Sequence, residues 1–424
     1  MINPYIHALL SLTNEVKEIS LIGDTMAYTW FGRPNYAFSE TAQKYWIGTT
    51  RDTDSGTTQF VTEYDINADT YTTTQVGTFY QKDDHNQAQI LIRKSDGRLI
   101  AAYTEHPGAA ALRYRISVNP YDSTEWEDEI ELNPFYPSYS YLSPYQSSTG
   151  NIYFFFRVLV VSGDDITATW YYMKSTDDAA TFGTPVEYYS NGATQNYNIT
   201  NQYEDTIHFA STNGHPNHVG EGAIGVYHFY FDMATDTFHK SDGTSLTLPL
   251  SIDVITNVYS PVSPDTAWIN DISFKNGLPR ILYPVYPAGL DPLVKWINKE
   301  LWYIEWDGSA WVNNKKVSDT MTGYIETTTD LDQYCYEGAS RFDTSNPDII
   351  WMPKQVNGVL EIHKVDLRVK PAYIEQLTFD STVNNWRPIS IPSKANNLLW
   401  LRNNYYYRYY AYSISLLTKT ESTE

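Results

Sequence analysis

Cysteine is almost absent from this chain of 424 residues, which contains only Cys335. An internal disulfide needs two cysteines, and so do the cysteine-based zinc motifs, so the sequence excludes both. The fold must therefore be held together by its core, its hydrogen bonds and its ion pairs.

Basic residues are also scarce. The chain has 29 Lys and Arg against 50 Asp and Glu, which gives a formal net charge of −21. A nucleic-acid binder needs a basic stripe that neutralises phosphates, so we expect no nucleic-acid partner. The acidic balance does not exclude an acidic polysaccharide, because a local basic pocket can persist within an acidic surface. High net charge by itself keeps a protein soluble.

Long apolar runs are missing as well. No stretch of about 18 apolar residues occurs, so we expect no membrane span. The N-terminal stretch MINPYIHALLSLTNEVKEIS lacks the basic start, the apolar run and the small-residue cleavage site of a signal peptide. This pattern is typical of a mature form without its leader, or of a protein released by another route, as a phage virion component is at lysis. We expect an extracellular or virion-associated location.

Aromatic residues, in contrast, are abundant. They make up 15% of the chain, with 37 Tyr and 12 Trp, and such rings suit β-sheet surfaces and carbohydrate contacts. Short strand-like runs recur from end to end, and Asp96-Gly97 and Asn357-Gly358 are typical hairpin turns. We distinguish seven units, each an inner strand followed by a hairpin. Their loose spacing of roughly 50 to 60 residues is typical of propeller blades.

The repeated unit predicts an all-β fold, a seven-bladed β-propeller. A jelly roll or a sandwich would explain the strands but not the repeat. We expect a single domain over residues 1–424, with an N-terminal lead-in at 1–20 and a polar tail at 418–424. One unit carries the Asp-box pattern S-x-D-x-G-x-T-F. Four residues match the pattern, Ser175, Asp177, Thr181 and Phe182, and Ala179 stands where the pattern has glycine. This structural turn marks the fold, not the function.

Polar residues beside the inner strands are the candidates for a site, because ligands of propellers bind at the central axis. His85 lies in "DDHN", directly before the expected inner strand "AQILI", and His106 follows the second strand of the same unit. Tyr141 is expected before the inner strand of the next unit, and Arg157 at the end of that strand in "IYFFFRV". Each residue alone has a plain structural explanation, such as a turn, a packing ring or an ion pair. Their coincidence favours a shared site.

These segments resemble the BNR-repeat propellers that include the ulvan lyases and related polysaccharide lyases. The resemblance rests on "DDHNQAQILIRKSDGRLIAAYTEH", on the stretch from Tyr141 to Arg157 followed by the Asp box, and on "TNGHP". It extends more loosely to "GLPRILYPVY" and "NGVLEIHKVDL". It implies a lyase that cleaves a uronic-acid-containing glycan, ulvan-like or capsular, by β-elimination, with an acidic polysaccharide as partner and no required cofactor.

The chemistry of β-elimination explains these residue types. The C5 proton of a uronate leaves only if the neighbouring carboxylate is neutralised, which Arg157 would do with help from His106 or Asn86. His85 and Tyr141 would then act as base and acid, and a single tyrosine in both roles is the alternative. Asp83 or Asp84 would orient His85 and tune its pKa.

Further candidates surround this set. Asn86, His215, Trp268 and Tyr286 are expected to bind substrate, and Trp30 and Tyr45 are further stacking candidates, with packing between blades as the alternative for each ring. Four histidines are candidates for a structural metal ion, although their spacing matches no compact zinc motif: His208, His215, His218 and His228.

Two other functions stay open. The first is a non-catalytic propeller that recognises glycans, or a structural or receptor-binding protein of a phage virion, in which a homo-oligomer or a virion assembly would be the partner. The second is a sialidase-type hydrolase, which also uses Asp boxes. We rank it last because the chain shows no arginine-triad pattern.

Overall fold

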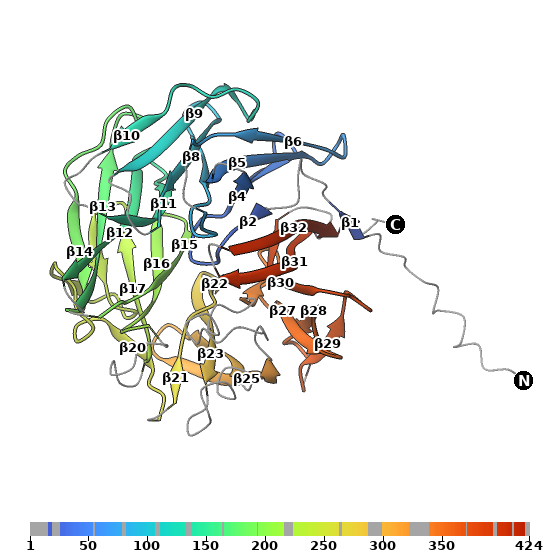
Figure 1. The fold of residues 1–424 in the computed structure, drawn as a ribbon. Helices are drawn as coiled ribbons and strands as arrows, with labels where there is room; N and C mark the ends of the chain where they lie inside the picture. The colour runs from blue at the N-terminus through green and yellow to red at the C-terminus, as the bar shows by residue number, and fades with distance from the viewer. Residues whose placement is uncertain are drawn as a thin grey trace, which may run out of the picture.

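The computed structural model describes residues 16–18, 26–53, 56–78, 82–106, 111–132, 138–162, 165–192, 194–215, 224–262, 265–286, 299–321, 339–369, 371–392, 397–408 and 411–419. Every regular element among them is a β-strand, and the strands form seven sheets around a central axis (Figure 1). The predicted seven-bladed β-propeller is confirmed. None of the described residues forms a helix long and apolar enough to cross a membrane.

Each blade is an antiparallel sheet whose first strand, the inner strand, lies next to the axis. In the first and fifth blades two short strands share this position. The first blade contains β2 (Met26–Ala27), β3 (Tyr36–Ser39), β4 (Lys44–Thr53), β5 (Gly56–Asp65) and β6 (Thr70–Gln75), and the second contains β7 (Gln89–Ile92), β8 (Arg98–Thr104), β9 (Leu112–Pro120) and β10 (Ile130–Leu132). The third blade contains β11 (Tyr139–Gln146), β12 (Ile152–Ser162), β13 (Asp165–Ser175) and β14 (Val186–Ser190). The fourth blade contains β15 (Asn198–Tyr203), β16 (Thr206–Thr212), β17 (Val226–Asp232), β18 (Thr237–His239), β19 (Ser245–Leu246) and β20 (Thr256–Tyr259).

The last three blades complete the ring. The fifth blade contains β21 (Thr266–Ala267), β22 (Asp271–Lys275), β23 (Leu278–Tyr286), β24 (Lys299–Trp306) and β25 (Trp311–Met321). The sixth contains β26 (Arg341–Phe342), β27 (Ile349–Val356), β28 (Val359–Asp366) and β29 (Tyr373–Gln376). The seventh contains β30 (Asn384–Ile391), β31 (Asn397–Arg408), β32 (Ala411–Lys419) and β1 (Val16–Glu18).

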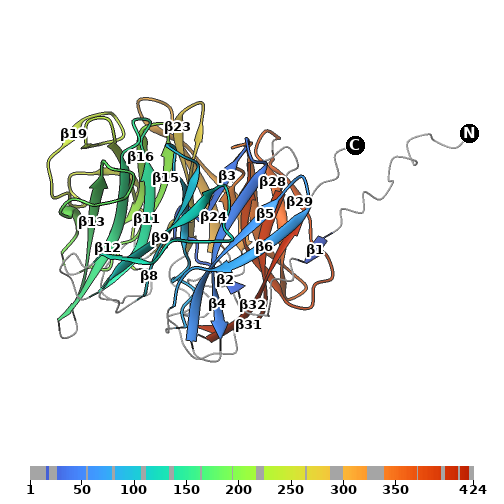
Figure 2. The ribbon, with the colours of Figure 1, turned by 90° about the horizontal axis from the view of Figure 1, so that it is seen from above.

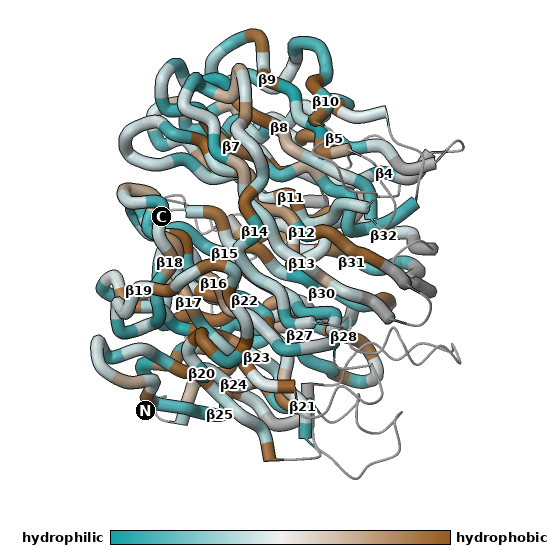
Figure 3. Tube along the Cα trace, turned by 90° about the vertical axis from the view of Figure 1, so that its left-hand side faces the viewer, coloured by the Kyte–Doolittle hydropathy of each residue, from teal (hydrophilic) through white to brown (hydrophobic). Residues whose placement is uncertain are grey.

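Apolar clusters between neighbouring blades form much of the core. One cluster joins Ile100 and Tyr114 of the second blade to Tyr139 and Phe154 of the third. Seen edge-on, the blades lie side by side, so one face of each packs against the next (Figure 2). Hydrophobic residues lie mostly within the strands, whereas many connecting turns are hydrophilic (Figure 3). Burial of each large apolar side chain contributes about 1.5–3 kcal/mol, so these interfaces hold the ring together.

Strand β1 closes the ring from the other end of the chain. Val16 pairs with Lys419 and Glu18 with Leu417 of β32, so the seventh blade is built from both ends of the sequence (Figure 1). The expected lead-in at 1–20 thus contains a structural strand, and Thr418 and Lys419 of the expected tail belong to β32.

The Asp box after β13 has the predicted structure. Asp177 accepts hydrogen bonds from Thr181 N at 2.9 Å and from Thr181 Oγ1 at 2.6 Å. Phe182 packs between blades, 4.3 Å from Phe154 and 5.8 Å from Tyr114 of the second blade, measured between ring centroids. Ala179 has φ +68, a left-handed conformation that explains why glycine is usual at this position.

The sequence prediction misplaced two site residues within the third blade. Tyr141 lies on the inner strand β11 rather than before it, and Arg157 lies on the second strand β12. The error has a physical cause: β11, YSYLSPYQ, is buried along its whole length, but its Ser and Pro residues do not give the apolar pattern of a buried strand. The apolar run of β12 gives that pattern, so the sequence predicts β12 as the inner strand.

Candidate functional site

The segment before β7 folds into a turn that its own side chains close. Asp83 Oδ1 accepts a hydrogen bond from His85 N–H at 2.9 Å, and Asp83 O accepts one from Asn86 N–H at 3.3 Å. The side-chain amide of Gln87 donates to Thr29 O and accepts from Thr29 N, which joins the turn to the first blade. Residues 83–87 are all buried. The turn therefore fixes the position of the His85 ring.

The structure brings the four predicted catalytic side chains together from the second and third blades. The rings of His85 and His106 stack with centroids 4.5 Å apart. The Tyr141 ring lies 5.8 Å from His85 and 5.5 Å from His106. The guanidinium carbon of Arg157 lies 4.3 Å from the centroid of the Tyr141 ring. The four residues form one buried cluster, and their catalytic roles stay a prediction.

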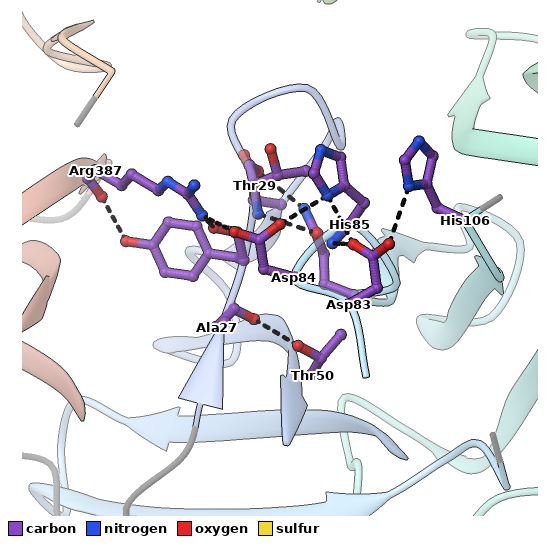
Figure 4. Close-up of polar contacts among 11 residues, drawn as sticks. Ala27, Thr29, Thr50, Asp83, Asp84, His85, His106 and Arg387 are labelled. Atoms are coloured by element: carbon purple, nitrogen blue, oxygen red, sulfur yellow. Dashed lines mark hydrogen bonds and ion pairs between the residues drawn. The ribbon is translucent and has the colours of Figure 1, made fainter. Parts of the chain in front are cut away.

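Charges alternate along a buried row that runs from the seventh blade into this cluster (Figure 4). Arg387 Nη1 lies 2.6 Å from Asp84 Oδ2, and Asp84 Oδ1 lies 2.7 Å from His85 Nδ1. His85 Nδ1 is also 2.7 Å from Asp83 Oδ1, and Asp83 Oδ2 is 3.0 Å from His106 Nδ1. Isolated charges are costly in such a buried place, so each is stabilised by its neighbour of opposite sign.

The two histidines have opposite pKa shifts although their rings stack. Burial disfavours the charged form of His85, but the carboxylates of Asp83 and Asp84 outweigh it and raise its pKa to about 9. Burial lowers the pKa of His106 to about 4, and the positive charges of His85 and Arg157 add to this effect against the attraction of Asp83. At neutral pH, His85 is therefore an imidazolium and His106 a neutral ring. If Nδ1 of His106 donates to Asp83, then its Nε2 is the basic nitrogen.

Arg157 is fully buried but only partly hydrogen-bonded. Its Nε donates to Ser140 Oγ at 3.0 Å, and the register of β11 and β12 sets this contact because the two residues are cross-strand partners. Its Nη1 and Nη2 have no hydrogen-bond partner among the described residues. The rings of Tyr141 and Tyr197 lie 4.3 and 4.9 Å from the guanidinium carbon. A guanidinium with two unused nitrogens is suited to bind a carboxylate.

Tyr141 is held in an unusual backbone conformation. Its φ is +56, and the pairing of β11 with β12 shifts between Ser140 and Ser143, as at a β-bulge. A left-handed conformation costs a residue other than glycine about 1–2 kcal/mol, so the surrounding structure must impose it. The Tyr141 hydroxyl has no hydrogen-bond partner in the described part of the chain. Burial raises the pKa of Tyr141 well above 10, so the ring is a neutral proton donor.

Trp268 and Tyr286 do not form open stacking platforms. Trp268 is 1% exposed, and its ring lies 5.2 Å from Tyr197 and 4.7 Å from His215. Tyr286 is fully buried at the end of β23. The rings are as buried as Arg157 and Tyr141, and their role in binding sugars stays a prediction. Trp30 and Tyr45 are buried to the same degree.

The four histidines predicted as metal ligands do not assemble among the described residues. His208 Nδ1 and His228 Nε2 are 3.0 Å apart, and His228 Nδ1 lies 2.8 Å from Ser241 Oγ. His215 packs elsewhere, against Trp268, and His218 lies outside the described residues.

A second group in the described chain has the chemistry of a metal site. Ligand atoms of Asp83, His85 and His106 lie within 4.8 Å of one another. A metal bound here would have to displace the proton that His85 Nδ1 shares with Asp83 and Asp84, and a metal at this site stays a prediction.

Arg387 is the site residue that the sequence prediction missed. It lies on β30 with φ +48, at a point where the pairing of β30 with β31 shifts between Trp386 and Ile389. It bonds Asp84 across a sequence separation of 303 residues. An arginine within the mostly apolar stretch "WRPISI" was the available signal, because a buried arginine needs an anionic partner.

The fold and the cluster define a β-propeller with titratable side chains gathered from three of its blades. Residues 28–319 match the family described as "BNR repeat-containing family member". The match covers more than half of the chain, and the chain belongs to this family.

Two curated relatives carry the name ulvan lyase. The chain is 27% identical over 271 residues to Ulvan Lyase-PL25 of Pseudoalteromonas sp. (strain PLSV), covering 55% of the chain and 53% of the relative. It is 25% identical over 277 residues to the ulvan lyase of Alteromonas sp. (strain LOR), covering 57% of the chain and 54% of the relative. These matches span about half the length of the relatives.

Solved structures of lyases share the fold. An ulvan lyase of polysaccharide lyase family PL25 has a TM-score of 0.67 at 18% identity over 96% of both chains. The same values hold for that lyase bound to -[GlcA(1-4)Rha3S]-. Polysaccharide lyase Uly1 has a TM-score of 0.59 at 12% identity, covering 92% of this chain and 91% of that one. At these identities the likeness concerns the fold alone.

Proposed function

We propose that this protein is a polysaccharide lyase that cleaves an ulvan-like, uronic-acid-containing glycan by β-elimination. The observation that carries the proposal is the buried guanidinium of Arg157, with two unused nitrogens, beside a neutral histidine and a neutral tyrosine. The two relatives named ulvan lyase support the choice of substrate. A polymeric substrate also supports action outside the cell.

The first requirement is to neutralise the uronate carboxylate. Arg157 Nη1 and Nη2 would bind its two oxygens, and the His85 imidazolium would add a second positive charge. This stabilises the enolate-like intermediate that forms when C5 loses its proton. One such donor typically contributes about 10²- to 10³-fold to the rate.

The proton transfers fall to the two remaining groups. His106 is neutral and can accept the C5 proton, whereas His85 already carries a proton and is a poor base. We therefore assign the base to His106 rather than to His85, which revises the assignment made from the sequence. Tyr141 would donate its phenolic proton to the departing C4 oxygen. These steps use protein side chains alone.

The test is to incubate the protein with ulvan, alginate, heparinoids and bacterial capsular glycans while following the ultraviolet absorbance of the unsaturated uronate product. Arg157→Gln, His106→Gln and Tyr141→Phe should each lower kcat/KM by at least about 10²-fold. Arg368→Gln is the matched control, because Arg368 is 59% exposed and pairs with Asp366 on the outer part of the sixth blade.

The outcomes separate the alternatives. Full activity in His106→Gln with complete loss in Tyr141→Phe would move both proton transfers to the tyrosine. Glycan binding without any new double bond across the panel would replace the lyase with the glycan-recognition or virion propeller.

A further inference from the structure

A polar cavity lies along the inner strands, apart from the His–Tyr–Arg cluster. Its volume is about 160 Å³, and its walls come from the inner strands of the first, third, fourth, fifth, sixth and seventh blades. Tyr145 on its wall lies four residues beyond Tyr141 on β11, which is roughly 13 Å at about 3.3 Å per residue. None of the four predicted catalytic residues lines it.

The charged groups of this cavity do not balance. Arg33 and Arg341 face one carboxylate, that of Asp271. Both oxygens of this carboxylate are already used, since Oδ1 accepts from Arg33 Nη2 at 2.7 Å and Oδ2 accepts from Phe342 N at 2.8 Å. The cavity therefore has one more positive charge than negative, and Arg341 is the arginine whose charge this carboxylate does not pair.

Arg341 is the group that needs a partner. It is 4% exposed, and its Nε and Nη2 have no hydrogen-bond partner among the described residues. Burial and the nearby Arg33 lower the pKa of Arg341 to about 9, as expected for a cation without enough compensation. An uncompensated buried cation is strongly destabilising, which makes an unfilled site costly.

Hydroxyl groups complete the donor set. Thr344 and Ser390 line the same cavity, and their hydroxyl oxygens are 2.9 Å apart, so they can share and redirect their protons. Tyr36 also lines the cavity, next to Arg341. A buried guanidinium surrounded by hydroxyl donors is suited to a small oxyanion.

We propose that this cavity binds one small tetrahedral oxyanion, sulfate or phosphate, which pairs with Arg341 and links the inner strands around it. The volume is several times the ~30 Å³ share of one liquid water, so the anion fits with part of its hydration. A bound anion would stabilise the ring, because it occupies the folded state alone.

The experiment follows thermal unfolding of the full chain by tryptophan fluorescence. Sodium sulfate and sodium phosphate are titrated from micromolar to millimolar concentrations against chloride at constant ionic strength. We expect a saturable rise in Tm for the wild type and for Arg157→Gln, in which the lyase cluster is altered. The saturable part should disappear in Arg341→Met, since the methionine leaves no cation to pair.

Two further measurements guard the result. Isothermal titration should give one oxyanion per chain for the wild type, and Tyr36→Phe, which keeps the arginine, should bind more weakly. Equal, non-saturating rises in the wild type and Arg341→Met would reflect a general salt effect and would overturn the proposal. Loss of the effect in Arg157→Gln but not in Arg341→Met would also overturn it, by moving the anion to the lyase cluster. This proposal stands whether or not the chain is a lyase.

Discussion

His85 and His106 stack at 4.5 Å, yet one is charged and the other neutral at pH 7. The difference lies in the number of carboxylates each ring contacts. His85 shares its Nδ1 between Asp83 and Asp84, whereas the ion-pair contact of His106 is with Asp83. Two identical side chains thus acquire the properties of an acid and a base from their immediate neighbours.

A bell-shaped pH profile follows from these shifts. The proposed reaction needs neutral His106 and charged His85, so kcat/KM should fall below about pH 4 and above about pH 9. Initial rates on ulvan, measured from about pH 3.5 to about pH 10, cover both limbs of the profile. In Asp84→Asn, which removes one carboxylate from His85, the alkaline limb should move to lower pH. An unchanged alkaline limb in that variant would show that His85 does not set it.

The Arg387–Asp84 pair should be strongly coupled in stability. Both side chains are fully buried, so solvent does not screen the pair. Removing one partner takes away the nearest opposite charge of the other buried group, and Arg387→Met or Asp84→Asn should each lower the free energy of unfolding by about 3–5 kcal/mol. The double variant should lose clearly less than the sum of the two. Urea denaturation of all four proteins completes the cycle, and additive losses would contradict the coupling.

At the scale of elements, hairpins were predictable from the sequence, whereas several inner strands were not. The turn at Asn357-Gly358 joins Val356 to its partner Val359, as a local Asn-Gly signal predicts, because hairpins depend on adjacent residues. The inner strands β21 and β26 are two residues long and carry no alternating pattern. Tertiary packing defines them.

The same distinction applies to the site. His85 and His106 were found from local context in one blade, and their convergence with Tyr141 and Arg157 was expected from the fold. Arg387 was missed, because nothing near it in the sequence points to Asp84. The burial of Trp268 and Tyr286 was not predictable, because composition does not tell an aromatic ring in a core from one in a groove.

Two glycine substitutions should separate close packing from backbone strain. A Cβ on Gly48 would lie 1.8 Å from the backbone oxygen of Ala88, at the end of the His85 turn. Gly48→Ala should therefore lower stability by more than about 2 kcal/mol and reduce activity by displacing the turn. In Gly358→Ala the new Cβ meets nothing within 4 Å, and the strain comes from the φ of +89. We therefore expect a loss of stability of about 1–2 kcal/mol with activity kept. Equal effects on activity would contradict a link between β4 and the turn.

At the scale of the whole molecule, three residue pairs between β1 and β32 join the ends of the chain. Removal of residues 1–18 should lower Tm and expose the edge of β32, which favours association between chains. Removal of residues 1–12 should have little effect, since it leaves β1 intact. Calorimetry and size-exclusion chromatography of both truncations measure this, and identical behaviour would mean that β1 contributes nothing to closure.

The contact between Asp84 and Arg387 also has a consequence for the order of folding. The second blade supplies Asp84 and His85, but Arg387 comes from the last blade to leave the ribosome. Until that blade docks, Asp84 beside His85 lacks the positive charge of Arg387. We expect catalytic competence to be the last property a newly made chain acquires. In refolding experiments, activity should therefore return with the slowest phase of tryptophan fluorescence, and an earlier return would show that the site matures before the ring closes.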